Sequence, residues 1–332
     1  MAAQLSIILQ EQKEMKILSL FDGMACGALA MQAAGIEIDK YIAYEVDKYA
    51  IQTAKHNFPF IEERGDVFKA DFTEYAGFDY LIGGSPCTYW SIAQTKNRET
   101  VASGMGWELF SQYVRALHEA KPRFFLYENN KSMSAAIRAS ITETFGFEPI
   151  LINSALVSAQ NRQRLYWCGI RQADGTYKKA DIQQPADRGI LLKDILETNG
   201  LTWKQKAYAV TATEWKGSSL QHCLAKHVRT QIAEPVNITK DGKAGTLRAT
   251  CRSIDAPIYE VKDGFITVKG NKYPIKLVDC FYIIRKLTVR ECMRLQTVPE
   301  WYEWPVSKSQ AYKMLGNGWT VEVIAHLLRG LK

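Results

Sequence analysis

KILSLFDGMACG, residues 16–27, carries the clearest structural signal in this chain. Its first half has the apolar composition of a buried strand, and a glycine-bearing loop, Phe21–Gly27, leads into helix-forming residues. A strand that runs through such a loop into a helix opens a doubly wound α/β sheet, in which ligands bind at the carboxyl ends of the strands. The loop lacks the dinucleotide fingerprint GxGxxG, which counts against a nicotinamide-dependent dehydrogenase.

Strands and helices alternate along the chain after this segment. The pattern predicts helices near 28–36, 48–58, 108–120 and 133–145, and strands at 41–47, 78–86, 124–129, 148–157 and 164–170, with a weaker strand near 61–67. Such alternation is typical of a parallel sheet covered by helices on both faces. Helical periodicity returns at 285–298 and 307–331, so the C-terminus is expected to rejoin this body.

The composition is that of a folded globular protein. The 332 residues are 47% hydrophobic and 23% charged, which excludes disordered and collagen-like chains. No apolar run approaches the roughly 18 residues of a membrane helix, and the N-terminal apolar run is too short for a signal peptide. We therefore expect a cytoplasmic protein.

Residues 171–285 differ from the rest of the chain. They are rich in turn sequences and hold 19 Lys and Arg against 12 Asp and Glu, whereas the remainder has 23 of each. This excess indicates either a solvated basic face or a segment that binds a polyanion. The expected organisation is a body at 1–170, a smaller and mainly β insert at 171–285, and a C-terminal return at 286–332.

The cysteines give no sign of a disulfide framework. There are seven, Cys26, Cys87, Cys168, Cys223, Cys251, Cys280 and Cys292, and no CxxC pair occurs among them. His222, Cys223 and His227 are close in sequence, but without a second cluster they are weak evidence for a metal. We expect no metal site.

Chemically active side chains follow several predicted strands directly. Glu45 and Asp66 stand where an acid can bind ribose hydroxyls or an adenine edge. Cys87 follows a Gly-Gly-Ser-Pro turn, which suits an exposed nucleophile better than a packed thiol. Glu128 ends another strand, while Arg162 and Arg164 have the spacing of one strand face. In a parallel sheet these groups converge on one edge.

These motifs resemble those of the DNA cytosine-5 methyltransferases over nearly all of residues 16–332. FDGMACG is similar to the family's S-adenosylmethionine loop, GGSPC to its Pro-Cys motif, YENN to its Glu-Asn motif and QNRQR to its Gln-x-Arg-x-Arg motif. The resemblance implies a Rossmann-like methyltransferase body with an inserted target-recognition domain. The cofactor-binding residues it implies are Phe21, Asp22, Gly23, Met24, Ala25, Cys26, Gly27, Glu45, Val46, Asp66, Val67, Pro86, Asn317, Gly318 and Trp319.

The resemblance also implies a mechanism. Cys87 adds to C6 of a cytosine flipped out of double-stranded DNA, Glu128 stabilises charge at N3, and Arg162 and Arg164 hold the base. Implied DNA contacts are Ser91, Arg229, Arg248 and Arg252. The resemblance further implies a bacterial or phage-infected cell. Whether the enzyme serves restriction-modification, acts as an orphan enzyme or protects a phage stays open.

Two departures, the role of one loop and two alternative functions stay open at this level. Asn130 replaces the family's usual Val after Glu-Asn, where it either packs or forms a hydrogen bond, and Cys26 adds a second thiol near the site. Residues 92–107 are either a lid over the flipped base or a long surface loop. The same motifs occur in a branch that methylates transfer RNA, and a DNA-binding paralogue without activity would also retain the basic insert.

Overall fold

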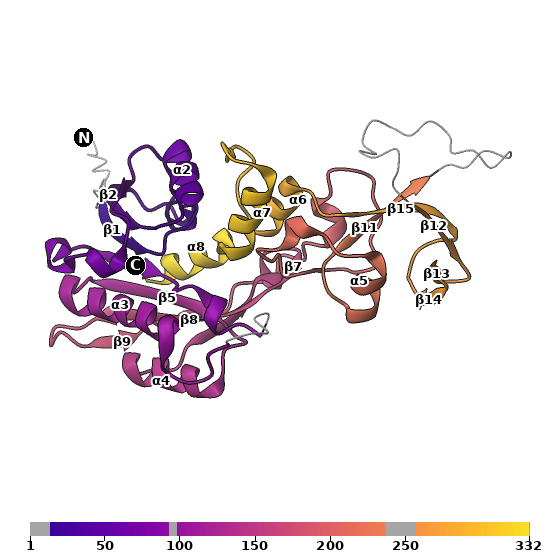
Figure 1. The fold of residues 1–332 in the computed structure, drawn as a ribbon. Coiled ribbons are helices and arrows are strands. Elements are labelled where there is room, and N and C mark those ends of the chain that lie inside the picture. Colours follow the sequence, from indigo (N-terminus) through magenta and orange to yellow (C-terminus); the bar gives the residue numbers. More distant parts are fainter. Residues whose placement is uncertain (1–13, 93–97, 237–256, 332) are drawn as a thin grey trace, which may run out of the picture.

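The computed structural model describes residues 14–92, 98–236 and 257–331. Its main sheet has the strand order β3-β2-β1-β4-β5-β8-β6, with β9 paired to β8 (Figure 1). The strands are β1 (Met15–Leu20), β2 (Ile38–Tyr44), β3 (Glu62–Glu63), β4 (Tyr80–Gly83), β5 (Phe124–Asn130), β6 (Ile150–Asn153), β8 (Gln163–Arg171) and β9 (Tyr177–Lys179).

Strands β1 to β5 are mutually parallel, as the alternation of strands and helices predicts. Strand β8 differs, because it runs antiparallel between β5 and β6. The expectation of a wholly parallel sheet is therefore wrong at this strand. The beginning of β8 lies beside the end of β5, with Arg164 opposite Asn130. The reversal thus brings Arg164 to the same edge as the carboxyl ends of the parallel strands.

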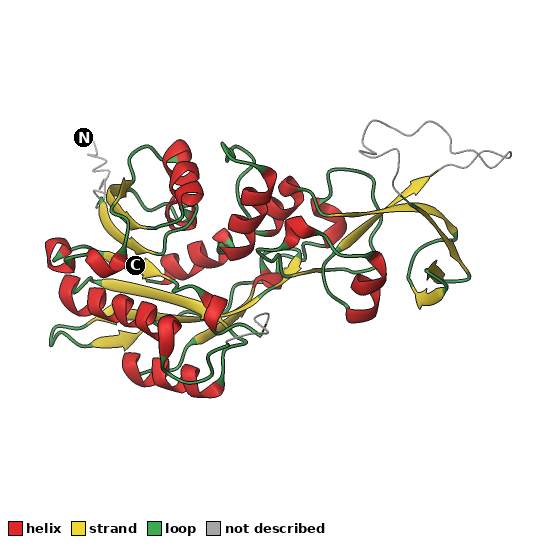
Figure 2. Ribbon diagram, viewed as in Figure 1, coloured by secondary structure: helices red, strands yellow, loops and turns green. Residues whose placement is uncertain are grey.

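Helices cover both faces of the sheet (Figure 2). Alternate residues of β1 enter opposite cores: Ile17 packs with helices α1 (Cys26–Ala33), α2 (Lys48–Asn57) and α8 (Val321–Gly330), and Leu18 with α3 (Gly104–Ala120) and α4 (Ala135–Phe145). This period of two is what a strand buried on both faces requires. Gly35, at a φ of +64°, follows α1 where the sequence predicts the helix to end.

The C-terminal segment returns to the body, as its helical pattern predicts. It forms α6 (Val289–Leu295), α7 (Lys308–Asn317) and α8, and α8 packs against α1 in the first core. Thr288 and Glu291 form a reciprocal capping box at the start of α6. The two ends of the sequence therefore build one core.

The basic insert contains a separate antiparallel sheet of order β11-β15-β12-β13-β14, which extends away from the body in Figure 1. The strands of this sheet are β11 (Gln231–Val236), β12 (Ile258–Lys262), β13 (Phe265–Val268), β14 (Asn271–Pro274) and β15 (Cys280–Lys286), and the insert also contains the helix α5 (Leu220–Lys226). Arg285 on β15 forms ion pairs with Glu234 of β11, at 2.7 Å, and Glu291 of α6, at 2.8 Å. The insert is also joined to the body by the parallel pair β7 (Gln160–Asn161) and β10 (Ala207–Tyr208).

Short 3-10 turns complete the described chain: η1 (Val67–Lys69), η2 (Phe72–Tyr75), η3 (Cys87–Tyr89), η4 (Ser154–Leu156), η5 (Leu192–Ile195) and η6 (Glu214–Lys216). Helix α3 begins at Gly104, so the last residues of the expected 92–107 loop are helical. Residues 93–97 of that loop lie outside the described residues. Among the described helices, none combines the length and apolarity needed to cross a membrane.

Candidate active site

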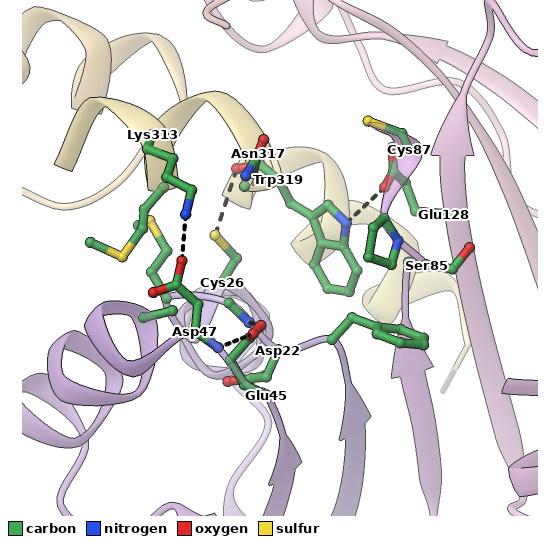
Figure 3. A pocket seen from close by; sticks show the side chains of 18 of the residues that line it. Asp22, Cys26, Glu45, Asp47, Ser85, Cys87, Glu128, Lys313, Asn317 and Trp319 are labelled. Atoms are coloured by element: carbon green, nitrogen blue, oxygen red, sulfur yellow. Dashed lines mark hydrogen bonds and ion pairs between the residues drawn. The ribbon is translucent and has the colours of Figure 1, made fainter. Parts of the chain in front are cut away.

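A pocket of about 230 Å³ lies at the carboxyl edge of the main sheet, beneath the end of α7 (Figure 3). Fourteen of the sequence-predicted residues line it: Phe21, Asp22, Gly23, Met24, Cys26, Glu45, Pro86, Cys87, Glu128, Arg162, Arg164, Asn317, Gly318 and Trp319. Segments as distant in sequence as 21–26 and 313–319 thus share one cavity.

Seven predicted residues that the structure describes lie outside this lining: Ala25, Gly27, Val46, Asp66, Val67, Ser91 and Arg229. For Gly27 the reason is packing, since a Cβ there would collide with Tyr41 and Ile82 in the core. Asp66 accepts the Phe68 amide at 3.0 Å and so caps η1. Val67 is buried in the second core, whereas Val46 is 72% exposed at the surface.

Cys87 is held at the first residue of η3, directly after the tight turn that ends β4. Gly84 permits this turn to approach β5, because a Cβ there would stand 2.9 Å from the Glu128 carbonyl and from Oε2 of the same residue. Ser85 hydrogen-bonds the hydroxyl of Tyr127 at 2.6 Å, and buried Asn129 donates to the Ser85 carbonyl at 3.2 Å. These bonds fasten the Cys87 loop to β5, and Asn129 is a positioning residue that the sequence analysis missed.

The Glu128 carboxylate is bound by two side chains, one at each oxygen. Oε1 lies 3.0 Å from Nε of Arg164, and Oε2 accepts the indole N–H of Trp319 at 3.0 Å. Figure 3 shows Trp319 between Glu128 and Cys26, so its ring separates the Cys87 side of the pocket from the side lined by the first loop. The arrangement fixes one carboxylate orientation beside the thiol.

Arg162 plays a different part from Arg164. It lies in the one-residue gap between β7 and β8, so the two arginines do not share one strand as expected, although both line the pocket. Its buried guanidinium donates to three backbone carbonyls, those of Val210 at 2.9 Å, Gly316 at 3.1 Å and Gly318 at 2.8 Å. Burial lowers the pKa of Arg162 to about 10, which leaves it charged at neutral pH. Arg162 therefore ties the insert to the C-terminal return.

The opposite side of the pocket is acidic. The Asp22 carboxylate accepts from Ser19 at 2.5 Å and from Tyr41 at 2.6 Å, and burial raises the pKa of Asp22 to about 6. The Glu45 carboxylate accepts hydrogen bonds from three backbone amides. These are the amides of Gly23 at 2.9 Å, Val46 at 2.7 Å and Asp47 at 2.8 Å. A rigid pair of acceptors results.

Asp47 and Lys313 also line the pocket and were not predicted. Lys313 Nζ lies 2.7 Å from Asp47 Oδ2, which links α7 to the start of α2 across the pocket. Burial acts to raise the pKa of Asp47, but the hydrogen bonds from Lys313 and the Tyr49 amide bring it below its ordinary value. Lys313 precedes Asn317 by one helical turn, which is the sequence signal that could have found it.

The two departures from the family pattern have distinct surroundings. Cys26 is buried, and burial raises the pKa of its thiol to about 12, so it is a poor nucleophile. Asn130 is 4% exposed and does not line the pocket. Its Oδ1 accepts the Ser132 hydroxyl at 2.9 Å, while its Nδ2 has no partner among the described residues.

The expected DNA contacts are scattered. Ser91 lies just after η3, near Cys87, and its amide donates to the Cys87 carbonyl at 2.9 Å. Arg229 is in the insert, where its guanidinium donates to Gly217 and Thr213. Arg248 and Arg252 lie outside the described residues. Within the described chain, no group of three or more His, Cys, Asp or Glu side chains is arranged to hold a metal ion.

Comparison with known proteins identifies one family over almost the whole chain. The sequence pattern of the family of C-5 cytosine-specific DNA methylases matches residues 15–332 of this chain. The type II methyltransferase M1.ScrFI of Lactococcus lactis subsp. cremoris is 28% identical over 320 residues, covering 93% of this chain and 76% of that protein. The orphan methyltransferase M.SPRI of Bacillus phage SPR is 24% identical over 430 residues, covering 96% and 97%.

Solved structures share the fold. The S. pombe Dnmt2 methyltransferase superposes with a TM-score of 0.59 at 14% identity, covering 96% of this chain and 98% of its own. The Entamoeba histolytica methyltransferase EhMeth gives a TM-score of 0.61 at 13% identity, with coverage of 96% and 98%. At these identities the likeness establishes the fold, a Rossmann-like methyltransferase architecture.

Proposed function

Since the chain belongs to the C-5 cytosine-specific DNA methylase family, and so transfers a methyl group from S-adenosylmethionine to C5 of cytosine in DNA, we propose that Cys87 is its nucleophile. The observation that carries this proposal is the meeting of Cys87, Glu128 and Arg164 in one pocket that also contains the acidic first-loop residues. A cytosine and a methyl donor can share such a cavity, with Trp319 between their two sides.

The hydrogen-bonding groups of the pocket fit S-adenosylmethionine. Asp22 Oδ2 is buried and has no hydrogen-bond partner among the described residues, which suits an ammonium group. The Glu45 carboxylate, fixed by backbone amides, keeps lone pairs for ribose hydroxyls. Gly318 leaves room beside Cys26, since a Cβ on it would stand 3.1 Å from that sulfur. Bound there, S-adenosylmethionine supplies an electrophilic methyl group.

Cys87 and Glu128 then act on the base. The Cys87 thiolate forms a bond to C6 of cytosine, and the ring electrons move toward C5 and N3. Glu128, held by Arg164 and Trp319, hydrogen-bonds the N3 and N4 edge and stabilises the charge that develops there. With the donor bound, C5 would gain the methyl group as the donor's methyl–sulfur bond breaks and a neutral thioether leaves. C5 would then lose its proton to a base, and the bond from Cys87 to C6 would break, which restores the thiolate and aromaticity.

The two arginines divide the remaining work. We assign Arg164 to the base and its O2, because it lies at the pocket beside Glu128. Arg162 is a positioning residue, since its donors are occupied by backbone carbonyls of the insert and of the C-terminal return. It holds those two segments around the pocket.

The insert, residues 171–285, is proposed as the target-recognition domain for double-stranded DNA. Its basic excess supports phosphate binding. A cytosine in a duplex must leave the helix to meet Cys87, so base flipping is part of the proposal. Strand β9 still pairs with β8, so the first insert residues complete the sheet of the body. The setting we infer is the cytoplasm of a bacterial or phage-infected cell.

Bisulfite sequencing of host DNA after expression of the wild-type chain tests this function. We expect protected cytosines within one recurring sequence, and none with Cys87→Ala. Methylation that appears in transfer RNA and not in DNA would contradict the proposed substrate. An unmethylated genome in cells that contain folded wild-type protein would contradict the activity.

A further inference from the structure

A second cavity lies within the insert, between α5 and the β13–β14 hairpin, which Figure 1 shows on the same side of β11 and β15. Its volume is about 490 Å³, and small-molecule sites typically span about 300–1,000 Å³. Three aromatic residues, Trp203, Tyr208 and Tyr273, contribute to its wall. No step of the proposed mechanism uses this cavity.

The cavity is positively charged as well as aromatic. Lys204, His227, Arg229 and Lys276 line it, and no Asp or Glu among the described residues does. The Lys204 ammonium stands 4.7 Å from the centroid of the Tyr208 ring, a cation–π distance. Glu214 influences Arg229 electrostatically but is not part of the lining. A ligand that combines a planar ring with a negative charge matches this wall.

Buried polar groups add a means of discrimination. Gln231 is 8% exposed and lines the cavity, and its amide nitrogen donates to the Cys223 sulfur at 3.5 Å. Sulfur is a weak acceptor, so this amide is available for a better partner. The buried hydroxyl of Tyr208 has no hydrogen-bond partner within the described residues. Amide and hydroxyl groups of this kind can read the edge of a base.

We propose that this cavity binds one nucleotide of the substrate DNA close to the target cytosine, with its base against the aromatic rings and its phosphate beside Lys204, Arg229 and Lys276. The proposal rests on the proposed function, because it takes duplex DNA as the substrate. It adds a second nucleotide site to the one that contains Cys87.

The connection between the two cavities favours DNA over a free nucleotide. Tyr208 belongs to β10, which pairs with β7 next to Arg162. Two residues later, the Val210 carbonyl accepts from Arg162 in the Cys87 pocket at 2.9 Å. The Cα atoms of Tyr208 and Val210 can be at most about 7 Å apart, and stacked nucleotides advance about 3.4 Å along one strand. The short segment 208–210 therefore contacts a lining residue of each cavity, from which we infer that one DNA strand can contact both.

Paired substitutions test the charge. Lys204→Ala with Lys276→Ala removes two cavity lysines. Lys262→Ala with Lys272→Ala removes two exposed lysines of the insert, on β12 and β14, that do not line the cavity. We expect the first pair to raise the Kd for duplex DNA containing the mapped site about tenfold, and the control pair less than threefold. Equal effects would overturn the proposal.

A second pair of variants tests the ring. Tyr273→Ala is expected to weaken DNA binding about tenfold, because base stacking on an aromatic ring is lost, and Tyr273→Phe should restore it. An unchanged thermal unfolding curve shows that each variant is folded, the insert included. Wild-type affinity in folded Tyr273→Ala would contradict the proposal.

Photocrosslinking identifies the source of the nucleotide. DNA substituted with 5-iododeoxyuridine near the target should crosslink to Trp203, Tyr208 or Tyr273. Binding of free dTMP to the cavity without any such DNA crosslink would assign it to mononucleotides and overturn the proposal. Methylation by the wild-type protein is measured separately, so failure of this inference is distinguishable from failure of the proposed function.

Discussion

The indole N–H of Trp319 donates to Glu128 at 3.0 Å, although 191 residues separate the two in sequence. This bond joins the C-terminal return to the end of β5. Because Trp319 also lines the pocket on its cofactor side, one side chain contacts both halves of the proposed site. The C-terminal return is thus part of the site as well as of the core.

Trp319→Phe should lower turnover about tenfold and leave DNA affinity unchanged. The ring remains, but Glu128 loses a hydrogen bond of the charged kind, worth about 1.5–3 kcal/mol. Single-turnover kinetics measure the effect, and Trp301→Phe, at a tryptophan that is 52% exposed, is the control.

A double-mutant cycle tests whether Trp319 acts through Glu128. In a Glu128→Ala background, Trp319→Phe should lower turnover less than twofold. Additive losses would show that Trp319 acts independently of Glu128.

Glu128→Gln should reduce turnover by about 10²–10⁴-fold, the usual contribution of a positioned acid or base. Gln preserves the shape but cannot carry or donate the same proton. Because charge at N3 develops only as Cys87 attacks, the Kd for DNA should change little. A loss confined to DNA affinity would remove Glu128 from the chemical step.

Glu63→Gln should stabilise the protein at alkaline pH. Both carboxylate oxygens of Glu63 are buried without a partner among the described residues, and burial, with help from Asp22 and Glu45, raises the pKa of Glu63 to about 8. Between about pH 4.5 and 8 the folded state retains a proton that the unfolded state releases. Stability therefore falls as pH rises through that window.

Thermal unfolding at pH 5 and pH 8.5 measures this effect. The Tm advantage of Glu63→Gln over wild type should be clear at the higher pH and small at the lower one. Glu62→Gln is the control, since Glu62 is exposed and pairs with Lys40 and Arg64. An equal advantage at both pH values would contradict the assigned ionisation.

Asn130→Val should leave the Kd for S-adenosylmethionine unchanged, because Asn130 does not line the pocket. The change removes a buried donor without a partner, which offsets the lost bond to Ser132. Calorimetric titration measures the Kd for S-adenosylmethionine, and a melting curve measures the Tm, which should change little. A shifted cofactor Kd would mean that Asn130 acts on the cofactor site.

Much of this site could be predicted because short motifs encode it. Cys87 and Glu45 each follow a strand and Glu128 lies near the end of one, and parallel strands carry such residues to one edge regardless of details elsewhere. Arg164 also reaches that edge, but by a route that periodicity does not reveal. Alternation of apolar residues is the same in either strand direction, so the reversal of β8 left no signal.

Long-range contacts account for what sequence reasoning missed. The role of Arg162 depends on carbonyls of Val210, Gly316 and Gly318, whose positions follow from how three distant segments pack. Asp47 and Lys313 are 266 residues apart, and each alone reads as a helix-terminal or surface charge. The insert's second cavity likewise arises from tertiary packing of residues that share no motif.

Covalent trapping of Cys87 examines the proposed chemistry at its first bond. Duplex DNA with 5-fluorocytosine at the mapped target should form a stable adduct in the presence of S-adenosylmethionine, because fluorine at C5 cannot leave as the proton does. Peptide mapping by mass spectrometry should place the DNA on Cys87, and Cys87→Ala should yield no adduct. An adduct on Cys26, or on any residue other than Cys87, would contradict the assignment.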